Sequence, residues 1–546
     1  MKVNESEKSY CKYCKHALTE PKEIELNYHI SCKKDLEEFQ GEDMIIIEFL
    51  SRILSLPEDQ IVTHLLHGDI KYNLDNNKKI NELKIKSAVY VRWKGLDSSL
   101  FNNINLPTDE LQDLRVFSFS YDNFGWEKDE WWGSDFKKVQ ENIGELKNLE
   151  VLNLSGNRIT TLPDSIGDLT NLKELYLAGN ELKYLPKTIT NLINIKILNL
   201  SNNPITTLPD TLGYLPNLEE FRLVDGSSVE LPDSFVNLKN LRVLDLRNVR
   251  NINFTDFGNF PKLEVLKLAS LKLYDKSYST LPDNFCNLQN LSELELNGCD
   301  LTVLPDDYGK LQNLVKIDLS MNQLSTFPKL QKSNLENLTT LNMERNKLVS
   351  LSETIKNLKN LKELYLGFNE LISLPESIGD LKNLNKLSLH HNKLTWLPDS
   401  IGKMKSLASI SLFDNRINSI PETIGNLINL QSLDLNKNKN LQELPESICN
   451  LSELQKLHIG DTKIENFPSG LSNLTNLKEL GILANQTIGF AEFGNKLPNL
   501  RELIIYEENT SSKFPKSVTS CFKKLRKKRC RITKVKMKNY EINHFY

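Results

Sequence analysis

The chain has 546 residues, of which 39% are hydrophobic and 25% are charged, which is typical of a folded protein in water. Its beginning, MKVNESEKSY, has no apolar core of a secretory signal, and no stretch is apolar for the roughly 18 residues that a membrane-spanning helix needs. We therefore expect no signal peptide and no membrane span. Without export, the eight cysteines are expected to be reduced in the cytoplasm.

The first 40 residues contain a C-x2-C pair followed, after 14 residues, by H-x2-C. Cys11, Cys14, His29 and Cys32 therefore form a Cys3His set with the spacing of a tetrahedral zinc site. Four protein ligands leave no open position, so the zinc is expected to be structural and single. The alternative is an accidental clustering of unrelated thiols and imidazoles.

This Cys3His segment resembles the first half of a LIM domain, or a treble-clef zinc finger. The LIM pattern continues with a cysteine three residues after Cys32, where this chain has Asp35. No second cysteine module follows, so the partner specificity of a complete LIM domain is not implied. We assign residues 1–40 to a zinc finger and residues 41–110 to a linker and N-terminal cap, with a degenerate repeat near Ile80.

Residues 111–508 are dominated by a repeat of 22 to 24 residues. Each unit reads LxxLxLxxN-x-L-xx-LP-xx-IG-x-L, as in "LEVLNLSGN" from Leu149 and "LKELYLAGN" from Leu172. The L-x-L alternation predicts a short strand with one buried face, and the LPxSIG segment predicts a helical turn on the other side. The repeated asparagine is expected to bond the backbone where the chain leaves the strand. It stands at Asn157, Asn180, Asn203, Asn322, Asn346, Asn369, Asn392, Asn415, Asn438 and Asn485, and is replaced by Cys299 and Thr462.

This pattern resembles the leucine-rich repeat, in the 23-residue class found in intracellular Ras-binding scaffolds and in the sensor arms of plant disease-resistance proteins. The resemblance implies an α/β solenoid of about 16–17 repeats, a horseshoe with parallel strands on its concave face. It also implies binding of a protein, such as a small GTPase or another signalling protein. No phosphate-binding loop or nucleophile motif is present, so we predict a scaffold that is not an enzyme.

One insertion interrupts the early repeats. The units at Leu114 and Leu149 are 12 residues further apart than the period, and the excess contains Trp126, Trp131 and Trp132 among acidic residues. The simpler interpretation is a loop that covers the end of the solenoid. The alternative is a second binding loop, because tryptophan is enriched at binding hot spots.

The adjacent histidines in "LSLHHN" lead to the main site prediction. Strand alternation places Leu387 and Leu389 in the core and His390 on the concave face. Residues one period away become neighbours, which gives a patch of Tyr365, Phe368, His390, His391, Phe413 and Asp414. We predict that this patch contacts the partner, against the alternative of a variable solvent-facing surface. A catalytic Ser388–His390–Asp414 triad lacks an oxyanion hole, so no catalytic residue is assigned.

The end of the chain is strongly basic. Residues 509–546 contain twelve Lys or Arg and one acidic residue, Glu541, while the rest of the chain is acidic. We assign this segment to a basic C-terminal cap or tail. The alternative function is association with nucleic acid through the zinc finger and this tail.

Overall fold

The computed structural model describes residues 70–74, 80–86, 114–120, 138–226, 229–249, 259–270, 280–305, 308, 310–327, 335–507 and 514–536. The chain divides into two compact units, Met1–Phe254 and Thr255–Tyr546. The zinc-finger residues and the tryptophan-containing insertion lie outside the described residues.

The described part of the first unit consists of short strands and 3-10 helices. Its strands are β1 (Ile70–Leu74), β2 (Ile80–Lys86), β3 (Val116–Ser120), β4 (Val151–Asn153), β5 (Glu174–Tyr176), β6 (Ile197–Asn199), β7 (Glu220–Arg222) and β8 (Val243–Asp245). Its 3-10 helices are η4 (Glu141–Glu145), η5 (Asp164–Asp168), η6 (Lys187–Asn191), η7 (Leu212–Tyr214) and η8 (Asp233–Asn237).

The described part of the second unit continues the same scheme and adds two α-helices near its end. Its strands are β9 (Val265–Lys267), β10 (Glu293–Glu295), β11 (Lys316–Asp318), β12 (Thr340–Asn342), β13 (Glu363–Tyr365), β14 (Lys386–Ser388), β15 (Ser409–Ser411), β16 (Ser432–Asp434), β17 (Lys456–His458), β18 (Glu479–Leu483), β19 (Glu502–Glu507) and β20 (Arg531–Lys536). Its 3-10 helices are η10 (Asp283–Asn287), η12 (Glu353–Asn357), η13 (Glu376–Asp380), η14 (Asp399–Lys403), η15 (Glu422–Asn426), η16 (Glu446–Asn450), η17 (Leu471–Asn473), η18 (Ala484–Gln486) and η19 (Gly494–Lys496). Its α-helices are α5 (Thr487–Phe493) and α6 (Lys516–Lys527).

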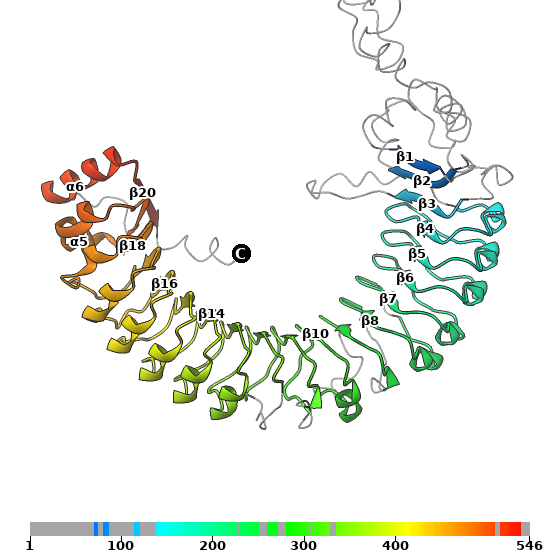
Figure 1. Ribbon diagram of the computed structural model, residues 1–546, viewed down its shortest axis with the longest axis horizontal. Helices are drawn as coiled ribbons and strands as arrows, with labels where there is room; N and C mark the ends of the chain where they lie inside the picture. Colours follow the sequence, from blue (N-terminus) through cyan, green and yellow to red (C-terminus); the bar gives the residue numbers. More distant parts are fainter. Residues whose placement is uncertain are drawn as a thin grey trace, which may run out of the picture. The chain divides into compact units, whose positions relative to one another are not determined.

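The strands pair with their sequence neighbours in the register that the repeat predicts. From β2 to β8, and again from β9 to β20, each strand pairs in parallel with the next, so Tyr365 lies opposite Ser388. In each unit the strands line one side and the 3-10 helices the other (Figure 1). The weak repeat copies predicted at Leu114 and Ile80 do supply paired strands, β3 and β2.

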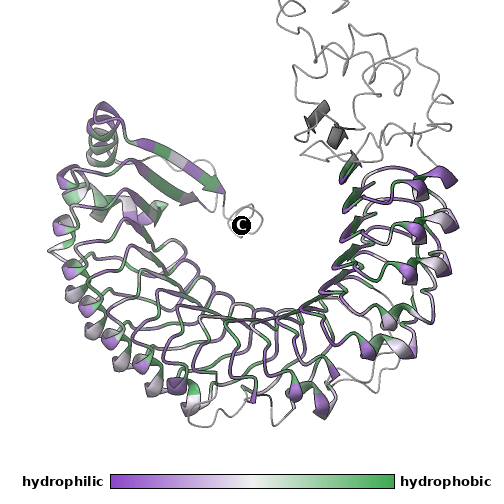
Figure 2. Cartoon of the chain, turned by 45° about the vertical axis from the view of Figure 1, so that its right-hand side comes forward, coloured by the Kyte–Doolittle hydropathy of each residue, from purple (hydrophilic) through white to green (hydrophobic). Residues whose placement is uncertain are grey.

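The core lies between the strands and the 3-10 helices. Leucines that alternate along each strand are almost fully buried, for example Leu387 at 1% and Leu389 at 0% exposure. In Figure 2, hydrophilic residues recur along the outer helical turns, whose apolar residues border this core. Within each unit, successive repeats therefore bury a layer of aliphatic side chains, as solenoids require.

The predicted asparagine ladder is present. Asn392 Nδ2 donates to the carbonyl oxygens of Leu366 and Leu389 at 2.9 and 3.0 Å, and its Oδ1 accepts from Leu371 N at 3.0 Å. Where Cys299 replaces asparagine, its thiol donates to Leu268 O at 3.1 Å, which confirms a structural cysteine. The prediction was wrong at one position of the ladder, because Asn485 is exposed.

Gln486 takes the place that the period assigned to Asn485. It is 2% exposed, and its Nε2 donates to Thr462 Oγ1 at 3.0 Å and to Ile464 O at 3.1 Å. The physical reason is that β18 is two residues longer than the preceding strands and runs directly into η18. The chain therefore turns one residue later than in the other repeats.

A second asparagine row lies at the start of the strands, and the sequence analysis missed it. Asn360 Nδ2 donates to Glu336 O at 2.8 Å, and Asn383 Nδ2 donates to Lys359 O at 2.9 Å. Asn171, Asn194, Asn217, Asn240, Asn290, Asn313, Asn337, Asn429, Asn476 and Asn499 make the corresponding bond to the preceding repeat. The sequence signal was the recurrent Asn of "LKNL", two positions after the leucine that recurs at the end of each outer turn.

Candidate functional site

Each strand from β4 to β17 is followed, a few residues later, by a residue in the left-handed region of φ, and the residue types there differ between repeats. In the first unit they are small or turn-forming: Gly156, Gly179, Asn202, Asp225 and Asn248. In the second unit, four successive strands, β11 to β14, are followed by Met321, Arg345, Phe368 and His391, with φ between 51° and 57°. A bulky side chain costs about 1 kcal/mol there relative to glycine. The run is therefore unfavourable for local folding and marks these side chains as candidates for another role.

Three of these side chains form a stack, which we call the rim stack: Arg345, Phe368 and His391. The guanidinium carbon of Arg345 lies 4.1 Å from the ring centroid of Phe368. The ring of Phe368 stacks on His391 with centroids 4.1 Å apart and an interplanar angle of 17°. Because neighbouring repeats fix the spacing, the stack is held by the backbone as well as by the contacts themselves.

Asp414 completes the rim on the next repeat. His391 Nδ1 lies 2.8 Å from Asp414 Oδ2, and the carboxylate side chain remains 43% exposed. The hydrogen bond from His391 lowers the pKa of Asp414 below its usual value. The surface thus presents, side by side, an exposed cation, a half-buried aromatic ring, an imidazole and a carboxylate.

His390 lies beneath this rim rather than on it. It is 7% exposed, and its ring occupies space left by Gly367, where a Cβ would be 2.2 Å from His390 Cε1. His390 Nδ1 is 2.7 Å from Ser388 Oγ, which also donates to Glu344 Oε1 at 3.0 Å. Burial, with His391 and Arg345 nearby, lowers the pKa of His390 to about 4. Burial also raises the pKa of Glu344.

Ser388, His390 and Asp414 do not form one hydrogen-bonded chain. Asp414 pairs with His391, whereas His390 pairs with Ser388, which is itself only 6% exposed. The structure therefore places Asp414 beside His391 and Ser388 beside His390, which is not the order of contacts in a Ser388–His390–Asp414 triad.

The predicted exposure of Phe413 was wrong. It is 4% exposed and packs against Ile504 and Tyr506 of β19. Tyr506 crosses the strand face over Gly460, where a Cβ would be 2.1 Å from the ring, and its hydroxyl lies 3.3 Å from Asn436 Nδ2. Phe413 therefore supports His391 from below, with ring centroids 5.1 Å apart.

The remaining predicted site residues fall into two groups. Tyr365 is half-buried on the strand face, its hydroxyl 3.2 Å from Glu363 Oε2 and its ring 4.9 Å from Lys386 Nζ. The predicted zinc ligands Cys11, Cys14, His29 and Cys32, and the loop residues Trp126, Trp131 and Trp132, lie outside the described residues. Within the described part of the chain, no group of three or more His, Cys, Asp or Glu side chains is placed to hold a metal ion.

None of the helices described here is long and apolar enough to cross a membrane.

Fold and surface together define a solenoid of parallel-strand repeats. Family comparisons agree. A model described as leucine-rich repeat region matches residues 227–370 and 409–543, and others described as leucine rich repeat match residues 136–182, 359–417 and 194–215. The chain belongs to the leucine-rich repeat family.

Solved structures of this family resemble the chain. A leucine-rich repeat protein of Leptospira interrogans is 30% identical, with a TM-score of 0.57, covering 78% of this chain and 90% of that one. Two Arabidopsis receptor kinase ectodomains share the fold. GASSHO1/SCHENGEN3 is 21% identical with a TM-score of 0.53, covering 85% and 71% of the two chains. HAESA is 23% identical with a TM-score of 0.53, covering 80% and 76%. No curated protein sequence matches the chain.

Proposed function

We propose that this chain is a non-enzymatic scaffold that binds a protein partner at the rim stack and Asp414. The observation that carries the proposal is the run of bulky left-handed residues from Met321 to His391. Their backbone conformation favours glycine, asparagine or aspartate, which the same chain uses in other repeats. A partner that contacts these side chains accounts for their presence.

The surface fits a polypeptide with an apolar side chain flanked by charges. Phe368 is half-buried, and its ring lies between Arg345 and His391, so a partner would contact the ring at its exposed edge. Arg345 and Asp414 supply charges of opposite sign on either side. Aromatic and arginine side chains are the usual energetic centres of protein interfaces. His390 and Phe413, which are buried, hold the anchors in place and are not expected to touch the partner.

Relatives of the fold support a polypeptide partner. The GASSHO1/SCHENGEN3 ectodomain was solved with Casparian strip integrity factor 2, and the HAESA ectodomain with a peptide hormone ligand. The comparisons give no support to a small GTPase in particular. The tryptophan-containing insertion, with Trp126, Trp131 and Trp132, remains the alternative binding surface.

The test is affinity capture from native cells followed by binding measurements with the purified partner. The variant combines Arg345→Asn, Phe368→Asn and His391→Asn, since asparagine tolerates the left-handed backbone that all three residues adopt. The control combines Tyr214→Asn and Ile428→Asn, which remove apolar side chains that are 66% and 54% exposed at or after outer helical turns. We expect a protein that the wild type and the control bind equally, and that the variant binds about 10- to 100-fold more weakly.

The melting temperatures of all three proteins should be similar, because the strain relieved in the variant offsets part of the lost stacking. A partner that binds the variant as tightly as the wild type would exclude the rim stack as the interface. Loss of binding on replacing the three tryptophans instead would assign the interaction to the insertion.

We also propose that Cys11, Cys14, His29 and Cys32 bind one structural zinc ion. The support is the spacing of the four residues in the sequence. Such a site would fold a small N-terminal module and would take no part in chemistry.

A further inference from the structure

The C-terminal end of the second unit carries an unusual concentration of positive charge. The described residues 514–536, which comprise α6, the following turn and β20, contain ten Lys or Arg and no Asp or Glu. Helix α6 buries Val518, Cys521, Phe522 and Leu525 against the last repeats. Its other face, the turn and the edge strand expose Lys516, Lys523, Lys524, Arg526, Lys527, Lys528, Arg529, Arg531, Lys534 and Lys536, which we call the cationic cap.

Among the described residues, the ion pair that a cation of the cap makes is that of Lys534, whose Nζ lies 2.6 Å from Glu507 Oε1. Lys528 Nζ donates to Asn495 O at 2.7 Å, a neutral acceptor.

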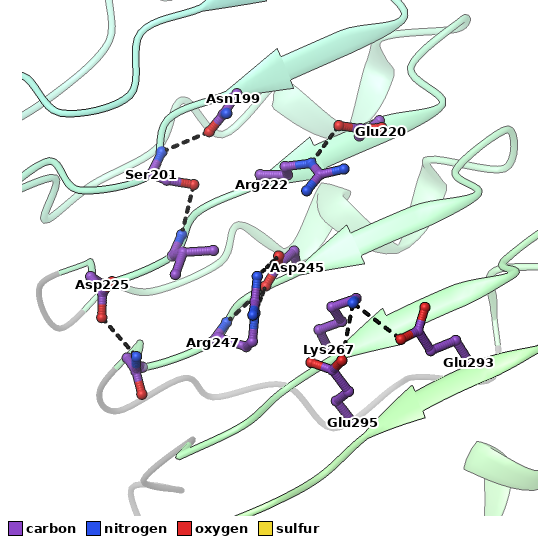
Figure 3. Close-up of polar contacts among 12 residues, drawn as sticks. Asn199, Ser201, Glu220, Arg222, Asp225, Asp245, Arg247, Lys267, Glu293 and Glu295 are labelled. Atoms are coloured by element: carbon purple, nitrogen blue, oxygen red, sulfur yellow. Dashed lines mark hydrogen bonds and ion pairs between the residues drawn. The ribbon is translucent and has the colours of Figure 1, made fainter. Parts of the chain in front are cut away.

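Cations on the repeats commonly behave differently. Arg247 and Asp245 form a two-point pair, and Lys267 lies 3.2 Å from Glu293 and 3.0 Å from Glu295 (Figure 3). The positive charges of the cationic cap are thus mostly not neutralised by carboxylates of the described residues, unlike those of Arg247 and Lys267.

Two structural roles explain some of these residues. Cations in the last turn of α6 interact favourably with the helix dipole, and lysines on an edge strand such as β20 discourage pairing with other chains. Neither role explains Arg529. Cys530 N donates to Leu525 O and Arg529 N to Arg526 O, both at 3.0 Å, so α6 ends in a Schellman motif. Arg529 occupies its left-handed position, with φ of 64°, where glycine is favoured.

We propose that the cationic cap binds the phosphate backbone of duplex nucleic acid, without reading its sequence. At about 100° per residue, Arg526, Lys523, Lys527 and Lys524 spread over roughly 160° around α6. Cations on both flanks of a cylinder match a groove bordered by two phosphate rows better than they match a flat bilayer.

The rest of the cap agrees with phosphate contacts alone. No large hydrophobic side chain of α6 or β20 is among the exposed ones of the described chain, so neither base stacking nor membrane insertion has an anchor there. The ring of Phe514 is covered by Lys534, whose Nζ lies 4.5 Å from its centroid. The cationic cap shares no residue with the rim stack, and the proposal does not depend on the proposed function.

The test is fluorescence anisotropy of a labelled DNA duplex of about 20 base pairs with the full chain, at about 50 to 200 mM salt. We expect binding that weakens steeply with salt, with a log–log slope of about −0.9 for each phosphate neutralised. Reversing three charges, with Lys523→Glu, Arg526→Glu and Lys527→Glu, should weaken binding by at least about 10-fold and flatten the slope. The matched control Lys356→Glu, Lys359→Glu and Lys403→Glu changes the net charge equally and should bind at least about 3-fold more tightly than the cap variant.

Arg529→Gly separates binding from stability. It should raise or preserve the melting temperature, because glycine suits the left-handed position, and yet weaken duplex binding. No duplex binding by the wild type at the lowest salt would overturn the proposal. So would equal loss in the cap variant and the control, or binding of phosphatidylserine vesicles without binding of the duplex.

Discussion

Mild acid should selectively destabilise the repeats around β14 through His390. This imidazole is buried and neutral, bonded to Ser388 and packed into the space left by Gly367. Its pKa is lowered to about 4, whereas an unfolded histidine titrates near 6.5. Between these values the unfolded chain binds a proton that the folded chain does not. The stability that the neutral His390 contributes is therefore fully present above about pH 6.5 and is lost as the pH falls toward 4.

The magnitude follows from the width of that window. Each pH unit corresponds to about 1.4 kcal/mol, so His390 accounts for a loss of about 3 kcal/mol across it. Glu344 acts in the opposite direction, because burial raises its pKa and the folded state then holds the proton more tightly. The net loss in the wild type should consequently be smaller than the contribution of His390 alone.

The assay is hydrogen exchange of peptides covering residues 384–415, at about pH 7 and about pH 4.5 after correction for intrinsic exchange. The comparison variant is His390→Asn, whose side chain replaces the Nδ1 contact to Ser388 and does not titrate. Protection in the wild type should fall in acid, and the variant should show a much smaller fall. Equal losses in both proteins, or a ring of His390 that titrates near 6.5 by NMR, would refute the reasoning.

Two further predictions concern the core and the zinc site. Leu389→Ala removes a fully buried side chain and should cost about 2–5 kcal/mol of local stability in denaturant unfolding; a cost below about 1 kcal/mol would contradict tight packing between repeats. Protein prepared without chelators should contain about one zinc per chain, and Cys32→Ser should remove it while the repeats stay folded; a zinc-free wild type would rule the site out.

The repeat could be predicted because its signal is local and redundant. Each strand is specified by alternating leucines that recur many times, so the register, the buried face and the asparagine ladder followed from one unit. The neighbours of His391 also followed, because the period alone places Phe368 and Asp414 beside it. Even the substitution at Cys299 was interpretable, since a thiol can donate to the same carbonyl as an amide.

The predictions that were wrong concern positions at which one repeat differs from the others. Phe413 was expected to be exposed because its own repeat leaves it so, and the residue that covers it, Tyr506, comes from a strand four repeats later. The sequence did contain a signal. Gly460 and Gly481 stand at strand-face positions where other repeats have side chains, and the ring of Tyr506 lies against both. Two adjacent glycines on a solenoid face are thus a cue that something from elsewhere crosses it.

The backbone adds a distinction that the sequence pattern does not make. In the repeat, the position after the strand is variable, so Phe368 and Gly179 look like equally acceptable choices. Both have φ above 50°, which glycine adopts freely and phenylalanine at a cost of about 1 kcal/mol. The same contrast applies to Arg529 at the end of α6. A bulky residue at a left-handed position lowers stability, whereas an exposed residue elsewhere need not. Left-handed positions that carry bulky residues are therefore more informative about binding than exposed positions in general.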